Sequence, residues 1–290
     1  MKAGWLKWVH APVFSKKYRV LNFSIYSFIF LYSFPLFSFE RVISLKPNIT
    51  EVVFALGLGN KLVGVTSYCD IPPEAKKITH VSDYIQPSLE KVIALKPDLI
   101  LTSQENSSRR EIEFLIEKGY RVENSKWDTL DNSLESILNL GLLLGKKEIA
   151  EKLTQEIINK LNNIASKNLG VKKKVLFVVG QQPLIVAGSN NIFGDVAHYL
   201  GLENVAAQSK LKYPNYSLEM LVKSSPDLII DLSIGMEGTQ KSEKDLLSWW
   251  RQYPWVPAVK NDRVYFFHME ELRASPRFPE AVERISRMIR

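Results

Sequence analysis

The sequence has a single cysteine, Cys69, among its 290 residues. One thiol cannot form an internal disulfide, and it excludes zinc or iron–sulfur sites that need several cysteines. The chain also lacks the many long apolar runs of a polytopic membrane protein. With 46% hydrophobic residues it is not a disordered chain either. It is therefore expected to fold as one large domain or as two modest ones.

The first 39 residues contain no Asp or Glu, although Lys and Arg are frequent there. The uncharged apolar run 20–39 follows the last of these basic residues. A basic flank followed by an apolar run is the layout of an export signal. We predict that residues 1–39 direct export, with cleavage near Ser38 favoured and an uncleaved membrane anchor as the alternative. The globular part is then expected to be periplasmic or otherwise extracytoplasmic.

The formal net charge of +7 resides mostly in that segment. The chain has 38 Lys and Arg against 31 Asp and Glu, and five of the basic residues precede residue 40. The remaining part is nearly neutral, so its charge does not favour a nucleic-acid partner. The four histidines are far apart in the sequence, and no metal site or resident cofactor is predicted.

Short apolar runs alternate with helical patterns on both sides of one long helical stretch. Alternation of this kind predicts parallel sheets covered by helices. The long stretch carries an apolar stripe at spacings of three and four residues, formed by Ile149, Leu153, Ile157, Leu161 and Ile164. We predict two Rossmann-like α/β lobes, 40–131 and 171–290, joined by a helical segment at 132–170.

The two predicted lobes contain copies of one unit. SLEKVIALKPDLIL at 88–101 aligns without gaps to SLEMLVKSSPDLII at 217–230, and LGLGN at 56–60 corresponds to LGLEN at 200–204. A duplicated lobe predicts two facing halves with a ligand cleft between them. In both copies a Ser, Ser88 or Ser217, is placed to cap a helix, and Glu90 or Glu219 follows in the first turn.

These motifs, with RVISLKPNITEVVFALGLG, VGVTSYCDIPPEA and RASPR, resemble the periplasmic binding proteins that serve iron-complex and cobalamin ABC importers, and most closely the cobalamin binders. The resemblance implies a monomeric solute-binding protein whose long helix limits closure of the lobes. It also implies that Glu90 and Glu219 meet arginines of a two-fold symmetric permease. The transported ligand would be cobalamin or a related corrinoid.

The same resemblance implies a set of ligand-binding residues in the cleft. Aromatic walls would come from Tyr68, Tyr84 and Tyr213, with Trp127 as a further candidate, and Arg273 would donate to ligand oxygens. Two positions depart from the family pattern. Met269 lies near the place where the family has an acidic cleft residue, and Ser103 stands where a tryptophan is common in the family.

Three other interpretations stay open. Haem or a ferric siderophore is the alternative ligand, and His80 or Tyr84 could supply a haem axial ligand. A two-lobed α/β enzyme, such as a transferase, would need an acid–base constellation or a phosphate-binding loop, and the sequence shows neither. A membrane-tethered sensor or chaperone for metal complexes would share the fold.

Overall fold

The computed structural model describes residues 38–82, 86–106, 109–168, 172–234 and 242–289. The predicted export segment, apart from Ser38 and Phe39, lies outside these residues. Within the described ranges, no helix combines the length and the apolar character that crossing a bilayer requires.

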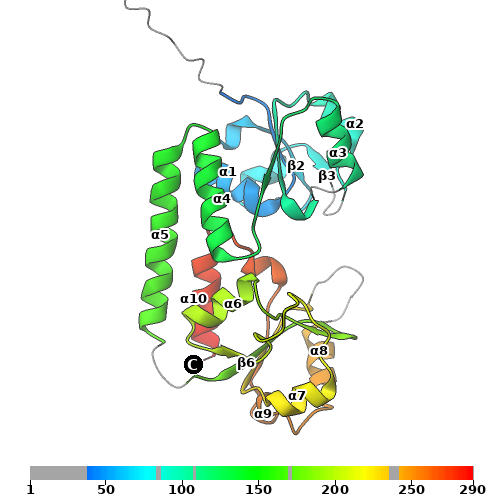
Figure 1. Ribbon diagram of the computed structural model, residues 1–290, viewed down its shortest axis with the longest axis vertical. Coiled ribbons are helices and arrows are strands. Elements are labelled where there is room, and N and C mark those ends of the chain that lie inside the picture. Colours follow the sequence, from blue (N-terminus) through cyan, green and yellow to red (C-terminus); the bar gives the residue numbers. More distant parts are fainter. Residues whose placement is uncertain (1–37, 83–85, 107–108, 169–171, 235–241, 290) are drawn as a thin grey trace, which may run out of the picture. The chain divides into compact units, whose positions relative to one another are not determined.

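The N-terminal lobe is built on a parallel sheet of five strands in the order β3-β2-β1-β4-β5 (Figure 1). Its strands are β1 (Val42–Ser44), β2 (Leu62–Thr66), β3 (His80–Ser82), β4 (Leu99–Ser103) and β5 (Val122–Ser125), and its helices are α1 (Pro47–Ala55), α2 (Leu89–Ala94) and α3 (Arg110–Glu117). The interior strand β4, next to the central strand β1, is buried throughout, as a strand with helices on both faces must be. The short strand β3 was not predicted from the sequence.

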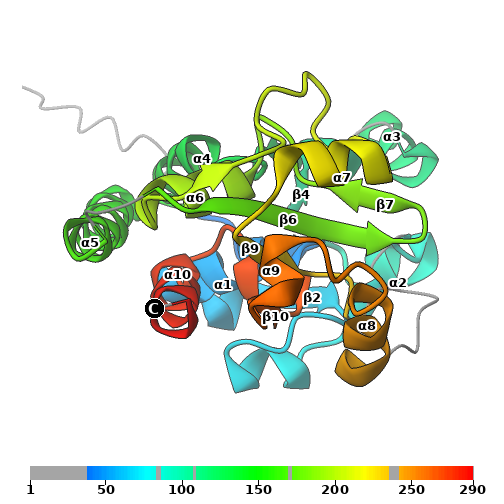
Figure 2. The same ribbon diagram turned by 90° about the horizontal axis from the view of Figure 1, so that it is seen from below.

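The C-terminal lobe has a mixed sheet in the order β10-β9-β6-β7, with β8 also paired to β6. Its strands are β6 (Lys174–Gln181), β7 (Leu184–Val186), β8 (Glu203–Asn204), β9 (Leu228–Asp231) and β10 (Val264–Phe266), and its helices are α6 (Ile192–Tyr199), α7 (Leu218–Ser224), α8 (Glu243–Trp250) and α9 (Pro257–Lys260). Apolar residues of α7, α8 and α9 share one core with this sheet, and Figure 2 shows these helices together. The antiparallel strand β7 was not predicted.

Three further helices connect the lobes. These are α4 (Leu130–Leu143), α5 (Lys147–Ser166) and α10 (Phe278–Met288). Figure 1 shows α4 and α5 side by side, and α10 also packs against α5. One hydrophobic core contains residues of all three helices and of both sheets. The predicted α/β fold of two lobes joined by a long helix is therefore confirmed.

The sequence repeat corresponds to a structural repeat. In both copies the predicted serine caps its helix, because the Ser88 hydroxyl accepts a hydrogen bond from the Lys91 N–H and the Ser217 hydroxyl accepts one from the Met220 N–H. Both copies then leave the helix through a left-handed residue, with φ of 45° at Lys96 and 48° at Ser225. Non-glycine residues rarely adopt this conformation, so its recurrence indicates a shared turn geometry.

The aspartate of the PDL motif joins each repeat to the first strand of its sheet. Asp98 accepts hydrogen bonds from the backbone N–H groups of Glu40 and Arg41, at 2.7 and 3.0 Å. Asp227 accepts one from the Lys174 N–H at 2.8 Å. The motif therefore positions β4 beside β1 in one lobe and β9 beside β6 in the other.

The predicted stripe on the long helix was wrong at its beginning. Ile149 is 42% exposed and Leu153 is only partly buried, whereas Ala150 and Thr154 face the core. The reason is the close approach of α4, in which a Cβ added to Gly141 would lie 2.2 Å from the Ala150 Cβ. Small residues are needed where the two helices touch, and this turns Ile149 to solvent. The stripe is correct at Ile157, Leu161 and Ile164.

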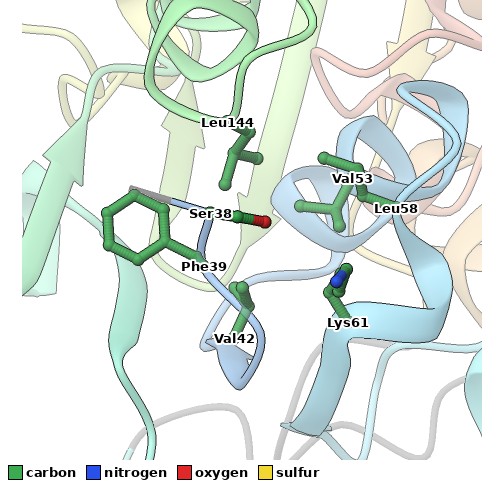
Figure 3. Close-up of a pocket in the computed structure, with 7 residues that line it drawn as sticks. All are labelled: Ser38, Phe39, Val42, Val53, Leu58, Lys61 and Leu144. Carbon is green, nitrogen blue, oxygen red and sulfur yellow. The ribbon is translucent and has the colours of Figure 1, made fainter. Parts of the chain in front are cut away.

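A small, mostly apolar pocket lies where the described chain enters the fold, between β1 and the loop that joins α4 to α5 (Figure 3). Its lining residues are Ser38, Phe39, Val42, Val53, Leu58, Lys61 and Leu144. Lys61 forms an ion pair with Glu40, which keeps the charged group of this site at the surface. Several residues that line this pocket belong to the main hydrophobic core. The described lining residues do not form a cluster of polar side chains that would bind a ligand.

A forked ion pair ties α1 to the chain just before α10. Arg277 donates from Nε and Nη2 to the two carboxylate oxygens of Glu51, at 2.9 and 3.0 Å. The Glu51 side chain is only 4% exposed, and its carboxylate raises the pKa of Arg277 above the usual value. Removing Arg277 would leave the buried Glu51 carboxylate without its partner, so the two-point contact helps to fix the geometry between α1 and the start of α10.

We expect Gly141→Val to destabilise the fold by about 1–3 kcal/mol, because the added side chain would force α4 away from α5. Gly194→Ala in α6 is the control, since no atom lies within 4 Å of the added Cβ and alanine favours a helix. Urea unfolding measures both free energies. A Gly141→Val protein as stable as the Gly194→Ala protein would contradict the close helix contact.

Candidate functional site

A pocket of about 640 Å³, partly open to solvent, lies between the two lobes. The N-terminal lobe and the segment after it contribute Lys46, Pro47, Asn48, Ser103, Glu105 and Trp127. The C-terminal lobe contributes Ile192, Phe193, Tyr213, Met269, Leu272, Arg273 and Ala274. The pocket is therefore a true interlobe site, with aromatic residues on both sides.

The topology of the first sheet explains why the pocket is at this edge. The order β3-β2-β1-β4-β5 changes direction between β1 and β4. In open α/β sheets, ligands bind beyond the carboxyl ends of the strands at this switch point. Lys46 and Asn48 follow β1, and Ser103 ends β4, so the pocket occupies that position.

The start of α1 forms the floor between the lobes. Pro47 is the first residue of the helix, where its missing N–H and fixed φ are favourable. Asn48 is nearly buried, and its amide donates to the Ala274 carbonyl at 3.4 Å. The contact joins the beginning of α1 to the segment that follows β10.

The start of α6 forms the opposite wall. The Asn191 side chain caps this helix by accepting a hydrogen bond from the Phe193 N–H at 3.1 Å. Asn191 is itself buried, and its amide donates to the Lys212 carbonyl at 3.1 Å. The cap therefore directs Ile192 and Phe193 into the pocket and connects them to the segment that carries Tyr213.

Tyr213 belongs to the segment 209–216, which bends at residues 210–213 and is joined to β7 and the residues after it. Backbone hydrogen bonds join Val186 to Pro214 at 3.1 Å and Gly188 to Lys212 at 2.8 Å. A Cβ added to Gly188 would lie 2.3 Å from the Leu211 carbonyl oxygen. Only glycine lets the 209–216 segment approach this closely.

The guanidinium of Arg273 is largely withdrawn from solvent, with its side chain 14% exposed. Its Nη2 lies 3.3 Å from a Glu270 oxygen, but in an orientation that does not form a hydrogen bond. Burial raises the pKa of the Cys69 thiol, and the charge of Arg273 is among the effects that oppose this.

Two hydroxyl groups at the end of β4 are buried without a hydrogen-bond partner among the described residues. They are Thr102 Oγ1 and Ser103 Oγ, and Arg273 Nη2 shares this property. Ser103 and Arg273 line the pocket, whereas Thr102 does not. Because buried polar groups nearly always form hydrogen bonds, the Ser103 hydroxyl and Arg273 Nη2, which is ion-paired with Glu270 but not hydrogen-bonded, indicate a place for ligand acceptors.

A second, more polar pocket adjoins the first and shares Ser103, Glu105 and Trp127 with it. Its other lining residues are Gln104, Ser125, Lys126, Asp128 and Lys212. The indole Nε1 of Trp127 donates to Ser125 Oγ at 2.7 Å, which satisfies the polar group of the side chain. The ring between the two pockets is thus free to act as an apolar wall.

The structure brings together three of the five predicted ligand-binding residues. Trp127, Tyr213 and Arg273 line the interlobe pocket. Tyr68 is half-buried at the end of β2 and is not among the residues that line it, and Tyr84 lies outside the described residues. The prediction missed Ile192 and Phe193, although an Asn cap before an apolar helix start could have indicated that they form a wall.

The predicted docking residues occupy equivalent places in the two lobes. Glu90 is in the first turn of α2 and Glu219 is in the first turn of α7, and both side chains are exposed. Of the histidines, His80 lies in β3 and does not line the interlobe pocket. Among the described residues, no cluster of His, Cys, Asp or Glu is arranged to hold a metal ion.

A family model of periplasmic binding proteins matches residues 42–270, which include both sheets and the residues that line the interlobe pocket up to Met269. The chain belongs to the periplasmic binding protein family. Proteins of this family bind solutes outside the cytoplasm, as the sequence resemblance had implied.

Two vitamin B12-binding proteins are similar to this chain over most of its length. The vitamin B12-binding protein of Vibrio cholerae is 28% identical over 252 residues, which cover 86% of this chain and 88% of that protein. The vitamin B12-binding protein of Yersinia pestis is 29% identical over 256 residues and covers 88% of each chain.

Solved structures show the same architecture. A possible iron-binding, periplasmic solute-binding protein of Staphylococcus epidermidis superposes with a TM-score of 0.79 at 26% identity, covering 87% of this chain and 99% of that one. The periplasmic vitamin B12-binding protein of V. cholerae superposes with a TM-score of 0.72 at 28% identity, covering 87% and 96%. A heme-binding protein of V. cholerae, at 22% identity and a TM-score of 0.77, shares the fold.

We expect Gly188→Ala to destabilise the protein by about 1–3 kcal/mol, because the methyl group would push away the segment that carries Tyr213. Gly180→Ala in β6 is the control, since the nearest atom to its added Cβ is 3.5 Å away, an ordinary contact. Thermal unfolding of the two proteins tests this. Equal midpoints would show that the 209–216 segment adapts without cost.

Proposed function

We propose that this chain captures cobalamin or a related corrinoid in the interlobe pocket and delivers it to an ABC importer, without catalysing a reaction. The observation that carries the proposal is the composition of the pocket. Trp127, Phe193 and Tyr213 offer broad apolar surface, and Ser103 and Arg273 offer buried donors. A corrin has a large apolar ring with amide groups at its edge, which needs both kinds of contact.

The named relatives support this ligand class over haem or a ferric siderophore. Both vitamin B12-binding relatives cover nearly the whole family region at close to 30% identity, whereas the heme-binding neighbour is similar in fold alone. No histidine is among the described residues that line the interlobe pocket, so a haem iron would depend on Tyr213 or Met269 there. Cobalamin brings its own axial base and needs no such side chain.

Titration of the purified protein with cyanocobalamin, hemin and a ferric siderophore, followed by calorimetry and tryptophan fluorescence, tests the ligand class. We expect a one-to-one complex with cyanocobalamin and quenching of the Trp127 emission. Trp127→Phe should remove most of the ligand-induced change, whereas Trp255→Phe, at an exposed position outside the pocket, should not. Binding of hemin alone would make the haem alternative correct, and no response to cyanocobalamin would contradict the proposal.

The Ser103 hydroxyl has a matched control in its neighbour. Both Thr102 and Ser103 carry buried, unpaired hydroxyls, but only Ser103 lines the pocket. We expect Ser103→Ala to weaken cyanocobalamin binding by up to about tenfold, the value of one hydrogen bond. Thr102→Val should leave affinity unchanged. Calorimetry on both variants distinguishes a ligand contact from a general effect of β4, and equal affinities would exclude Ser103 as a contact.

We also propose that Glu90 and Glu219 dock the loaded protein on the permease. Two exposed carboxylates at equivalent positions of a repeated unit fit a partner with two-fold symmetry. The combination Glu90→Ala and Glu219→Ala should abolish uptake of labelled cobalamin into cells while leaving its binding to the purified protein intact. A matched control removes one exposed first-turn glutamate from each lobe, Glu113 and Glu243. Normal transport by the Glu90 and Glu219 variant would show that the docking assignment is wrong.

A further inference from the structure

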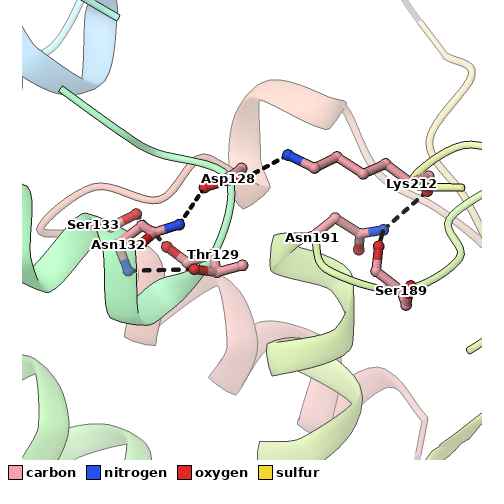
Figure 4. Close-up of polar contacts among 7 residues, drawn as sticks. All are labelled: Asp128, Thr129, Asn132, Ser133, Ser189, Asn191 and Lys212. Carbon is pink, nitrogen blue, oxygen red and sulfur yellow. Dashed lines mark hydrogen bonds and ion pairs between the residues drawn. The ribbon is translucent and has the colours of Figure 1, made fainter. Parts of the chain in front are cut away.

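An ion pair crosses from one side of the cleft to the other beside the pocket. The Lys212 ammonium lies 2.5 Å from a carboxylate oxygen of Asp128 (Figure 4). Asp128 follows Trp127, and Lys212 precedes Tyr213, so each charged residue adjoins one of the pocket aromatics. The two aromatics come from different sides of the cleft, and this ion pair joins the segments that carry them.

Asp128 is held firmly on its own side. The Asn132 amide donates to its other oxygen at 2.6 Å, and Thr129 caps the same first turn of α4. The Leu130 N–H also donates to Asp195 of α6 at 2.8 Å. Burial alone raises the pKa of Asp128, but the Lys212 ammonium and the Asn132 amide outweigh it and keep that pKa below its ordinary value. The carboxylate is thus charged and oriented toward Lys212.

Lys212 is held by its backbone. Its carbonyl accepts hydrogen bonds from the Gly188 N–H at 2.8 Å and from the Asn191 amide at 3.1 Å. Asn191 in turn caps α6 at Phe193. Movement of Lys212 would therefore be transmitted to Tyr213 directly and to Phe193 through the Asn191 cap, and both aromatics line the pocket.

The solvent exposure of the two side chains shows whether the ion pair mainly stabilises the fold or mainly sets the position of the neighbouring segments. The Lys212 and Asp128 side chains are 48% and 28% exposed, in contrast to the nearly buried Glu51 of the pair with Arg277. Exposed ion pairs contribute little to stability, and solvent screens them. The Asp128–Lys212 pair can, however, favour one arrangement of the two segments that carry Trp127 and Tyr213, which other hydrogen bonds already hold in place.

We propose that Asp128 and Lys212 are positioning residues whose ion pair aligns Trp127 and Tyr213 across the cleft and so prepares the pocket for its ligand. The inference rests on the proposed function, because it assigns the pair to the same pocket. A pocket that is aligned before binding loses less conformational freedom when the ligand enters, and therefore binds more tightly. Loss of the pair should act mainly through faster ligand release.

The test is a double-mutant cycle with cyanocobalamin as the probe. We expect Asp128→Asn and Lys212→Met each to weaken binding by about twofold to fivefold. The double variant should bind no more weakly than either single one, because both changes remove the same interaction. The exchanged pair, Asp128→Lys with Lys212→Asp, should recover part of the affinity. Glu151→Gln and Lys147→Met are the controls, since they break an exposed pair on α5 away from the pocket.

A second measurement does not depend on the ligand. Acrylamide quenching of the Trp127 fluorescence is measured as the difference between each protein and its matching Trp127→Phe protein. We expect this quenching to increase in both single variants. It should also increase in the parent protein at about 1 M salt, because salt at that concentration strongly screens the ion pair. Unchanged quenching, or additive losses in the cycle, would overturn the positioning role. A parent protein that binds neither cyanocobalamin nor hemin nor a ferric siderophore would contradict the proposed function. The quenching result would still decide the role of the ion pair.

Discussion

One apolar core that passes through both lobes determines how the rest of the structure is arranged. It includes Val42 and Leu101 of the first sheet, Val175 and Ile230 of the second, and the inner faces of α4, α5 and α10. Removing apolar surface from water is the dominant favourable term in folding, and separating the lobes would expose this shared surface again. The forked pair between Glu51 and Arg277 adds a directional contact between the same elements. The two lobes are therefore held together along the side formed by these helices.

The pocket side of the molecule is held by different forces. Its walls are strand ends, helix starts and loops, and backbone hydrogen bonds to Val186 and Gly188 hold the 209–216 segment. The buried Ser103 hydroxyl is left without a hydrogen-bond partner among the described residues there, at a cost of about 1–3 kcal/mol. The shared core can tolerate that cost because it does not depend on the pocket. Packed helices allow small shear movements, so we expect ligand binding to shift the pocket walls more than the lobes themselves.

Much of the fold could be predicted because its signals are local. The PDL motif recurs at the same place in both repeats, although the backbone N–H groups of Arg41 and Lys174 that Asp98 and Asp227 bind lie 57 and 53 residues earlier in the chain. Ser88 and Ser217 cap the helices that they precede. The repeat itself predicted two similar lobes, because two copies of one local pattern must fold in the same way. The strand β7 escaped prediction because its antiparallel pairing depends on a turn and not on an alternating pattern.

The remaining errors come from contacts between elements. Periodicity placed Ile149 in the core, but the small contact between Gly141 and Ala150 decides which side of α5 meets α4. The pocket has the same dependence. Local pattern shows that Ser103 and Trp127 follow strands, but only the packing of the lobes shows that they face Phe193 and Tyr213. A binding site between two lobes is therefore a product of the core that fixes the lobes, and its residues can be assembled only after that core is known.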